Sequence, residues 1–105
     1  MSDVYTTGSW VPNAGEEEAF VAAWSEFASW ASTMPGAGTV RLARDLRDPN
    51  RFVSFARWES FEAMRGWKDS SEFKPRMGRV QQHVDKFAPT ELEVVAVFEN
   101  GAAAT

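Results

Sequence analysis

The sequence contains no cysteine and a single histidine, His83. Without cysteine there is no disulfide framework and no thiolate metal site, and one histidine cannot supply the several converging ligands that a nitrogen-bound metal needs. No carboxylate cluster replaces them, so we expect no bound metal. No Ser-His-Asp arrangement, glycine-rich phosphate loop or paired-carboxylate motif stands out either, which leaves the common hydrolytic and nucleotide-binding classes without support.

Positive charge is also scarce: 11 Lys and Arg stand against 15 Asp and Glu, a formal net charge of −4. This balance argues against nucleic acid, which needs a basic surface, and against an anionic membrane surface. No apolar run approaches the roughly 20 residues of a membrane span. The start, Met1-Ser2-Asp3, lacks the basic and apolar regions of a signal peptide. We therefore expect a cytoplasmic protein with no nucleic-acid or membrane partner.

Large aromatic rings, by contrast, are plentiful, with five Trp and eight Phe among 105 residues. A chain of this length forms one domain with a modest core. So many rings either fill that core or line a ligand pocket. We expect a single domain over residues 1–105, with an ordered core from about 4 to 98 and a flexible tail over 100–105.

The first half of the chain predicts a strand, a helix and a hairpin. Residues 4–11 are rich in β-branched and aromatic residues and end at a Pro-Asn-Ala-Gly turn. Three consecutive glutamates then suit a helix N-terminus. The helix that follows has an apolar face at steps of three and four and stops at a Pro-Gly pair: Phe20, Ala23, Trp24, Phe27, Trp30, Ala31 and Met34. Residues 39–46 and 51–58 predict two strands joined by a turn.

The second half predicts two helices and a last strand. Ser60 is placed to cap a short helix with an apolar side: Phe61, Met64 and Trp67. A longer helix, closed by Pro89, is predicted from an apolar stripe: Phe73, Met77, Val80, Val84 and Phe87. Residues 91–98 predict the last strand. The order β-α-β-β-α-β is that of a ferredoxin-like α+β unit, a four-stranded antiparallel sheet with helices on one face.

Two predicted strands, 51–58 and 91–98, are apolar on both faces. In the first, Phe52 and Ala56 lie on one side and Val53 and Phe55 on the other. A sheet with one face in water should be polar on that face. Because helices cover only one face, a second copy of the sheet related by a twofold axis is the simplest cover for the other. We predict a homodimer; the alternative is that the helices wrap further round the sheet.

Residues 51–60, RFVSFARWES, together with Glu62-Ala63 and Trp67, resemble the most recognisable segment of the antibiotic-biosynthesis-monooxygenase family. Residues 71–73 and 87–93 are similar to the family as well, so that the likeness runs from about residue 4 to 98. Members of the family are small dimeric α+β-barrel proteins. The resemblance implies this fold and this pairing, whereas the chemistry differs between members.

In the cofactor-free, quinone-forming branch of the family, a Trp at the end of the third strand works with an Asn four positions earlier and a Tyr six positions later. Trp58 matches the Trp, whereas Ser54 and Met64 stand where the Asn and the Tyr would be. An arginine, Arg76 or Arg79, would supply the positive charge that holds a phenolate in such sites. Partly from the resemblance, we predict Trp58 and Arg76 as catalytic residues, with a substrate-binding set around them: Phe52, Ser54, Met64, Trp67, Arg79 and His83.

In the haem-degrading branch, the site has an Asn on the first strand, a Trp on the second helical segment and an axial His nine residues later. Trp67 matches the Trp, but Thr7 replaces the Asn and Arg76 replaces the His. Losing the iron ligand disfavours haem degradation, unless His83 serves as an unusual ligand. The other interpretation of His83 is an ordinary histidine on the surface of a helix.

The first hypothesis is therefore a cofactor-independent monooxygenase that holds a phenolic or polycyclic aromatic ligand between sheet and helices, stacked on Trp58 and Trp67. A phenolate or enolate reacts with oxygen directly, so the protein would supply orientation, charge stabilisation and exclusion of water. The alternatives are that both Trp residues belong to the core, and that the protein is a non-catalytic binding or stress-associated relative. The substitutions noted above, at Thr7, Ser54, Met64 and Arg76, favour the non-catalytic hypothesis.

Overall fold

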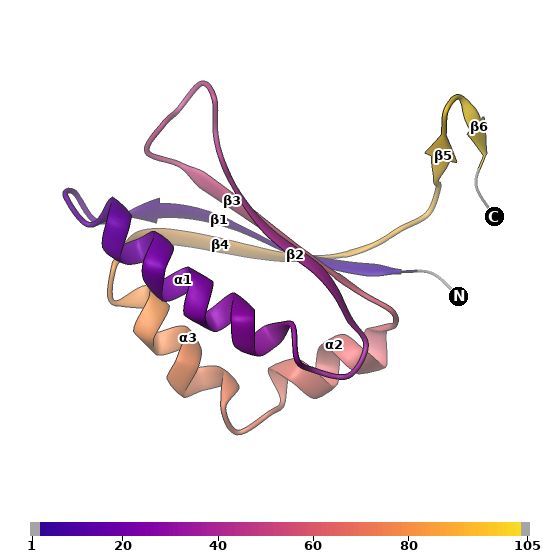
Figure 1. Cartoon of the computed structure of the whole chain (residues 1–105), viewed down its shortest axis with the longest axis horizontal. Coiled ribbons are helices and arrows are strands. Elements are labelled where there is room, and N and C mark those ends of the chain that lie inside the picture. The colour runs from indigo at the N-terminus through magenta and orange to yellow at the C-terminus, as the bar shows by residue number, and fades with distance from the viewer. Residues whose placement is uncertain (1–2, 104–105) are drawn as a thin grey trace.

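In the computed structural model, which describes residues 3–103, a four-stranded antiparallel sheet carries the helices on one face (Figure 1). The elements run in the order β1 (Val4–Pro12), α1 (Glu17–Ala31), β2 (Ala37–Arg44), β3 (Phe52–Trp58), α2 (Phe61–Lys68), α3 (Phe73–Gln81) and β4 (Val84–Glu93). A small hairpin of β5 (Phe98–Glu99) and β6 (Ala102–Ala103) follows. The α+β, ferredoxin-like fold predicted from the sequence is confirmed.

Strand β1 is central in the sheet, which has the order β2-β3-β1-β4. Its residues alternate between buried and half-buried from Val4 to Trp10, as expected for a strand with one face on the core. Antiparallel pairing places Gly8 opposite both Ser54 on β3 and Pro89 on β4. Side chains at these positions therefore share the inner face of the sheet, beneath the helices.

The first two helices follow their sequence patterns closely. Helix α1 buries four residues of the predicted apolar face: Phe20, Trp24, Phe27 and Ala31. Ser60 caps α2, because its Oγ accepts a hydrogen bond from the backbone N–H of Ala63 at 3.1 Å. Between α1 and β2, Gly36 has a φ of +82°, and a Cβ there would lie 2.6 Å from the Cβ of Ala63. Only glycine fits this turn.

The boundary between α3 and β4 differs from the prediction. Helix α3 ends at Gln81 rather than near Pro89, and the last strand of the sheet covers 84–93 instead of 91–98. The apolar stripe that predicted a single long helix is therefore divided, with Phe87 on the strand. Pairing with β1 along its whole length supplies a ladder of backbone hydrogen bonds that the helix would have to give up. Pro89 is tolerated because β4 is an edge strand.

This correction removes half of the sequence argument for a second copy, because residues 94–97 have no regular secondary structure. The other half stands: Figure 1 shows the three helices on one side of the sheet, so they do not wrap round to the other side. On that outer face, Val53 and Phe55 are half-buried and Leu92 is 50% exposed. The apolar outer face of the sheet is thus left uncovered within one chain.

The core lies between the inner face of the sheet and the helices, where Trp58, Phe20, Met64 and Val80 are completely buried. Of the tail predicted at 100–105, residues 102 and 103 form β6, and 104 and 105 lie outside the described residues. Among the helices in residues 3–103, none has the length and apolar character that crossing a membrane requires.

Candidate functional site

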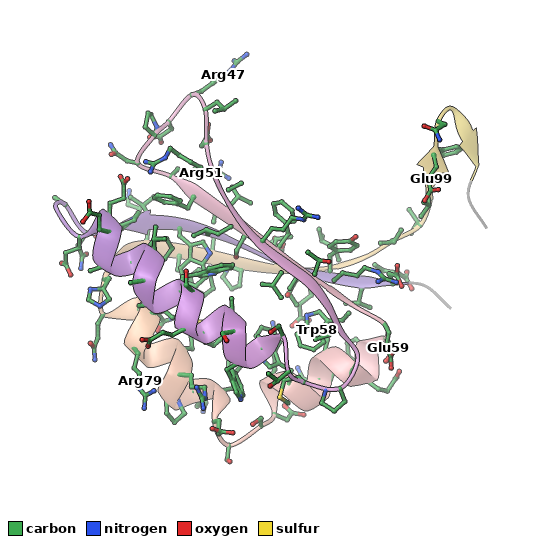
Figure 2. The ribbon with its side chains drawn as sticks, viewed as in Figure 1. Arg47, Arg51, Trp58, Glu59, Arg79 and Glu99 are labelled. Atoms are coloured by element: carbon green, nitrogen blue, oxygen red, sulfur yellow. The ribbon has the colours of Figure 1, made fainter. Side chains whose placement is uncertain are left out.

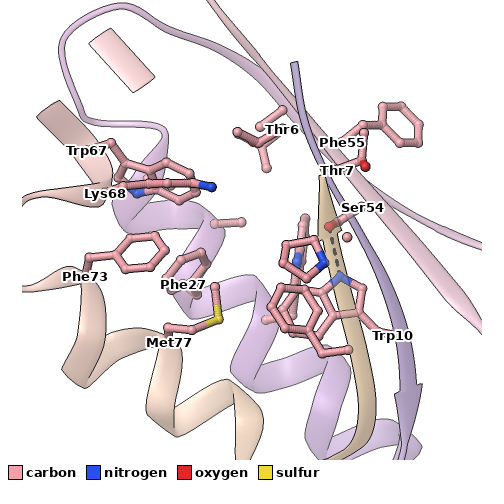
Figure 3. Close-up of a pocket in the computed structure, with 18 of the residues that line it drawn as sticks. Thr6, Thr7, Trp10, Phe27, Ser54, Phe55, Trp67, Lys68, Phe73 and Met77 are labelled. Atoms are coloured by element: carbon pink, nitrogen blue, oxygen red, sulfur yellow. Dashed lines mark hydrogen bonds between the residues drawn. The ribbon is translucent and has the colours of Figure 1, made fainter. Parts of the chain in front are cut away.

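A cavity of about 220 Å³ lies between the inner face of the sheet and the helices (Figure 3). Its volume exceeds the roughly 150 Å³ that admits benzene to an apolar protein cavity. Aromatic and aliphatic side chains from β1, α1, α2, α3 and β4 make up most of its wall: Trp10, Trp24, Phe27, Ala28, Ala31, Trp67, Phe73, Met77, Phe87 and Pro89. Two of its lining residues, Gln81 on α3 and Pro89 on β4, are exposed to solvent.

The floor of the pocket is built by Trp10, Phe87 and Ser54 around Gly8. The rings of Trp10 and Phe87 stack with centroids 4.0 Å apart, and Trp10 Nε1 donates a hydrogen bond of 2.9 Å to Ser54 Oγ. A Cβ on Gly8 would lie 2.7 Å from Trp10 Nε1 and 2.9 Å from Phe87 Cε1. These contacts are too short, so the absent side chain is what lets the three neighbours meet.

One wall of the pocket is Trp67 on α2, held by rings on several sides. It stacks on Trp58 with centroids 4.8 Å apart, and Phe73 meets it edge-on at 4.9 Å. Its Nε1 is buried without a hydrogen-bond partner among the described residues. The indole of Trp58, by contrast, donates to Thr6 Oγ1 at 3.3 Å. Trp67 is therefore fixed by ring packing alone, with an unpaired donor that costs about 1–3 kcal/mol.

Lys68 is the only charged side chain among the residues that line the pocket. It is the last residue of α2, and its Nζ lies 2.6 Å from Oε2 of Glu91 on β4. The hydrogen bond from Lys68 holds the pKa of the Glu91 carboxyl below its usual value. Glu91 stands opposite Thr6 in the sheet register, so the ion pair lies on the inner face beside the cavity. A ligand oxygen could compete with Glu91 for this ammonium.

Only Ser54 and Trp67 of the sequence-predicted site residues lie on the pocket wall. Trp58 is completely buried behind Trp67. Met64 is completely buried as well, and Phe52 packs against Phe20 with ring centroids 5.3 Å apart. Trp58, Met64 and Phe52 therefore belong to the core, whereas Trp67 lines the pocket.

The predicted cationic residues lie away from the cavity and are not among its lining residues. Arg76 pairs with Glu72 at 2.9 Å, and its guanidinium lies 4.9 Å from the centre of the Trp30 ring. Arg79 is exposed on α3 and points away from the sheet (Figure 2). The positively charged residue that lines the pocket is Lys68, whereas the sequence predicted an arginine there.

His83 lies in the turn between α3 and β4, with its Nδ1 2.9 Å from Glu16 Oε1. This hydrogen bond, with help from Asn13, lowers the pKa of the Glu16 carboxyl. The pairing joins the two turns at one end of the domain. The histidine is not among the residues that line the pocket. Its contact with Glu16 connects two turns instead.

Sequence reasoning missed Gly8, Trp10, Phe87 and Lys68. Phe87 was missed because the sequence predicted it on α3, whereas it lies on β4. Gly8 could have been found, because a single glycine within a predicted strand indicates close approach of a backbone or a ring. Lys68 carries no local signal, because its position at the pocket depends on a cavity that the four strands of the main sheet and the three helices build together. Within residues 3–103, no group of three or more His, Asp or Glu side chains is arranged to hold a metal ion.

Comparison with known proteins adds a family and a set of related folds. A family model described as "Antibiotic biosynthesis monooxygenase" matches residues 5–75. The solved structure of SnoaB, a cofactor-independent oxygenase from Streptomyces nogalater, superposes with a TM-score of 0.81 at 17% identity, covering 90% of this chain and 95% of that one. No curated protein sequence matches the chain.

Two further structures, from other organisms, show the same fold. Rv0793 from Mycobacterium tuberculosis has a TM-score of 0.77 at 18% identity, over 90% of this chain and 96% of that one. A conserved protein from Methanosarcina mazei has a TM-score of 0.79 at 12% identity, over 88% and 92% of the two chains. At such identities the likeness demonstrates the shared fold and does not extend to individual site residues.

Proposed function

Because the chain belongs to the antibiotic biosynthesis monooxygenase family, we propose that it is a cofactor-independent monooxygenase of a phenolic or polycyclic aromatic substrate. The observation that carries this proposal is the pocket itself, an apolar cavity of about 220 Å³ walled by rings and bordered by one ammonium group. Planar apolar substrates suit such walls, and an acidic oxygen suits the ammonium. A cofactor-independent oxygenase with the same fold gives the chemistry a precedent.

The proposed reaction needs no external reductant. Oxidation of a ring CH₂ to a carbonyl removes four electrons from the substrate, and O₂ accepts all four. One oxygen atom enters the new carbonyl, and the other leaves as water with the two hydrogens of the CH₂ group. The reaction starts when the substrate loses a proton, because the resulting enolate or phenolate is electron-rich enough to reduce oxygen. The protein must therefore favour the anion and exclude water.

In this proposal, Lys68 takes the role that the sequence suggested for Arg76 or Arg79. Its ammonium lies at the pocket, whereas Arg76 is engaged with Glu72 and Trp30. A cation beside a phenol lowers the phenol's pKa by favouring the charged form. Trp67 would stack on the substrate, and Trp58 would act as a positioning residue that holds Trp67 from behind. Ser54 would contribute through the Trp10 ring that it orients.

We also propose that the protein is a homodimer, joined through the face of the sheet that no helix covers. Val53, Phe55 and Leu92 give this face its apolar character. A twofold pair of sheets would bury the apolar residues of both copies, which is the usual way in which such a face is covered. Each copy would keep its own pocket on the opposite, helical side of its sheet.

The test is oxygen uptake and tryptophan fluorescence with a panel of anthrones, naphthols and hydroquinones. We expect at least one compound to quench the fluorescence and to be oxidised with consumption of O₂. Ala28→Phe, on the pocket wall, should abolish both signals, whereas Ala22→Phe, exposed on the same helix, should change neither. Quenching and uptake that survive Ala28→Phe would show that the pocket is not the site.

A non-catalytic binding protein is the second candidate, and one observation favours it. Trp58 is the only match to the quinone-forming set of residues, yet it is completely buried and its indole N–H is engaged by Thr6. The same panel separates the candidates. Compounds that bind and are blocked by Ala28→Phe, but that consume no oxygen, would favour the binding protein over the oxygenase.

A further inference from the structure

Methionine is the only source of sulfur in this protein, because the sequence has four Met and no Cys. Among the described residues, Met64 is completely buried in the core, and Met34 packs against the core without lining the pocket. Met77 is the one described methionine that lines the pocket (Figure 3). The described lining of the pocket thus contains a single thioether.

Met77 lies at the middle of α3, on the side of the helix that covers the pocket. Its side chain is half-buried, and Figure 3 shows its sulfur turned toward the cavity, on the same side as Phe27 and Phe73. A thioether is polarizable and packs well against aromatic rings. In its reduced form, Met77 therefore completes the apolar wall that a flat, apolar ligand needs.

The chemistry proposed for this pocket brings an oxidant to that sulfur. When the substrate passes only two electrons and two protons to O₂, the oxygen leaves as hydrogen peroxide instead of entering a carbonyl. Peroxide oxidises methionine to the sulfoxide. In that step an S–O bond forms at Met77 Sδ and the O–O bond of the peroxide breaks. The sulfur loses two electrons, and the second oxygen leaves as water with both hydrogens of the peroxide.

We infer that Met77 is an oxidation site, and that its conversion to the sulfoxide by hydrogen peroxide lowers the affinity of the pocket for aromatic ligands. The inference rests on the proposed function for an internal source of peroxide, whereas the site itself responds equally to added peroxide. Oxidation replaces an apolar group in the wall with a strongly polar S=O group. A ligand that fills the pocket would then shut this oxygen off from water, beside the rings of Phe27 and Phe73, which donate no hydrogen bond. Burying a polar group in this way is costly, so the ligand binds less tightly.

The other two described methionines serve as internal controls. Met64 is completely buried, so peroxide should oxidise it more slowly than Met77. Met34 is half-buried, yet its oxidation adds no polar group to the pocket wall. Loss of ligand binding should therefore follow the oxidation of Met77 and not that of Met34.

Binding of 2-naphthol before and after treatment with hydrogen peroxide tests the inference. Peptide mass spectrometry locates the sulfoxides, and tryptophan fluorescence gives the Kd. We expect peroxide to raise the Kd about tenfold or more in wild type and in Met34→Leu, and to leave it unchanged in Met77→Leu. Methionine sulfoxide reductases for both sulfoxide epimers should restore the wild-type value. Met77→Gln, which carries a polar oxygen permanently, should bind more weakly than Met77→Leu and should not respond to peroxide.

A second measurement follows turnover, with any compound of the panel that the protein oxidises. Oxygen uptake by wild type should slow as Met77 sulfoxide accumulates, and added catalase should prevent the slowing. Met77→Leu should keep its own initial rate without catalase. Slowing that is equal in the two proteins, or that catalase does not prevent, would contradict oxidation of Met77 by peroxide from the pocket.

The outcomes separate this inference from the proposed oxygenase. Met77 that stays reduced after Met34 has been oxidised, or an equal rise in Kd for Met77→Leu and wild type, would overturn the inference and leave the oxygenase standing. Wild type that does not bind 2-naphthol before oxidation would overturn it as well. Binding that is lost with oxidation of Met77, in a protein that consumes no oxygen with the panel, would support the oxidation site and contradict the oxygenase.

Discussion

Trp10 Nε1 and Ser54 Oγ are joined by a hydrogen bond of 2.9 Å that links β1 to β3 beneath the pocket. The bond passes beside Gly8, which stands directly opposite Ser54 in the sheet. It holds the Trp10 ring against Phe87, so that side chains from three strands form one floor. Ser54 stands where the quinone-forming branch of the family has an asparagine. In this structure its hydroxyl is an acceptor for the indole, which connects sheet stability to the shape of the site.

Ser54→Ala should lower the free energy of unfolding by about 1–3 kcal/mol, because it leaves the buried N–H of Trp10 without an acceptor. Urea denaturation measures this loss. Trp10→Phe removes the donor instead, and the double variant should lose less than the sum of the two single losses, since the bond can be broken only once. Additive losses would mean that the hydrogen bond does not contribute to stability.

Gly8→Ala should destabilise the protein by about 1–3 kcal/mol, the usual cost of an extra methyl group in a packed core. The new Cβ would lie within 3.0 Å of Trp10, Phe87 and Ser54. Gly78→Ala on α3 is the matched control, because a Cβ there meets nothing within 4 Å. We expect the control to be neutral or to gain up to about 1 kcal/mol from helix propensity. Equal effects at the two positions would contradict the packing of the floor.

The Lys68–Glu91 pair should make stability depend on pH in a defined direction. Its hydrogen bond lowers the pKa of Glu91 in the folded chain, so the folded state takes up the proton less readily than the unfolded state. The stabilisation is therefore present above the unfolded pKa and is lost as pH falls through the lower folded value. Both groups are partly exposed, so its size should be no more than about 1 kcal/mol.

The Lys68→Met variant lacks the ion pair with Glu91, so comparing its stability with that of wild type at several pH values measures the contribution of the pair. The difference in Tm between wild type and Lys68→Met should be largest near neutral pH and should shrink as the pH is lowered below about 4. Lys74→Met, at an exposed position on α3, controls for the loss of one positive charge. A difference in Tm that grows as the pH falls would contradict a lowered pKa of Glu91 in the folded chain.

Lys68→Met should also weaken the binding of ionised ligands. A hydroxylated naphthalene or anthraquinone changes colour when it loses its proton, so the pKa of the bound ligand can be read from its absorbance. We expect wild type to bind it with a lowered pKa, and Lys68→Met to shift that pKa back toward the value in water by about one unit. Arg79→Ala should leave it unchanged. A shift that depends on Arg79 and not on Lys68 would reverse the assignment of the cation.

Haem should not give a Soret shift that depends on His83. The ring of His83 is bound to Glu16 at the end of the domain and does not line the pocket. Titration of wild type and His83→Ala with haem, followed by absorbance, should give the same spectra. A saturating Soret shift that is lost in His83→Ala would show that the histidine leaves Glu16 to bind iron, and would restore the haem hypothesis.

Patterns confined to one element were predicted well from the sequence. The buried face of α1 and the Ser60 cap of α2 depend on spacings of three and four residues along one helix. The faces of β3 follow from simple alternation, and the structure places Phe52, Ala56 and Trp58 on the buried side. Trp67, which the family resemblance also names, lines the pocket.

The end of α3 could not be predicted, because an apolar stripe at steps of three and four continues from Val80 through Phe87 even though the backbone changes from helix to strand. Only pairing with the distant β1 decides between the two conformations. The charged residue that lines the pocket could not be predicted for a related reason. Lys68 directly follows Trp67 and Arg76 lies three residues after Phe73, each on a helix, and nothing local distinguishes the one that contacts Glu72 from the one that lines the cavity.

The sequence by itself thus determined the element types, the inner apolar faces and the absence of any cysteine chemistry, since these depend on composition and short spacings. Tertiary structure alone decided which rings face the cavity. Trp58 and Trp67 stack on each other, yet one is sealed in the core and the other lines the pocket. That difference arises where β1, β3 and α2 meet, because exclusion from a packed core is a property of all the surrounding segments together.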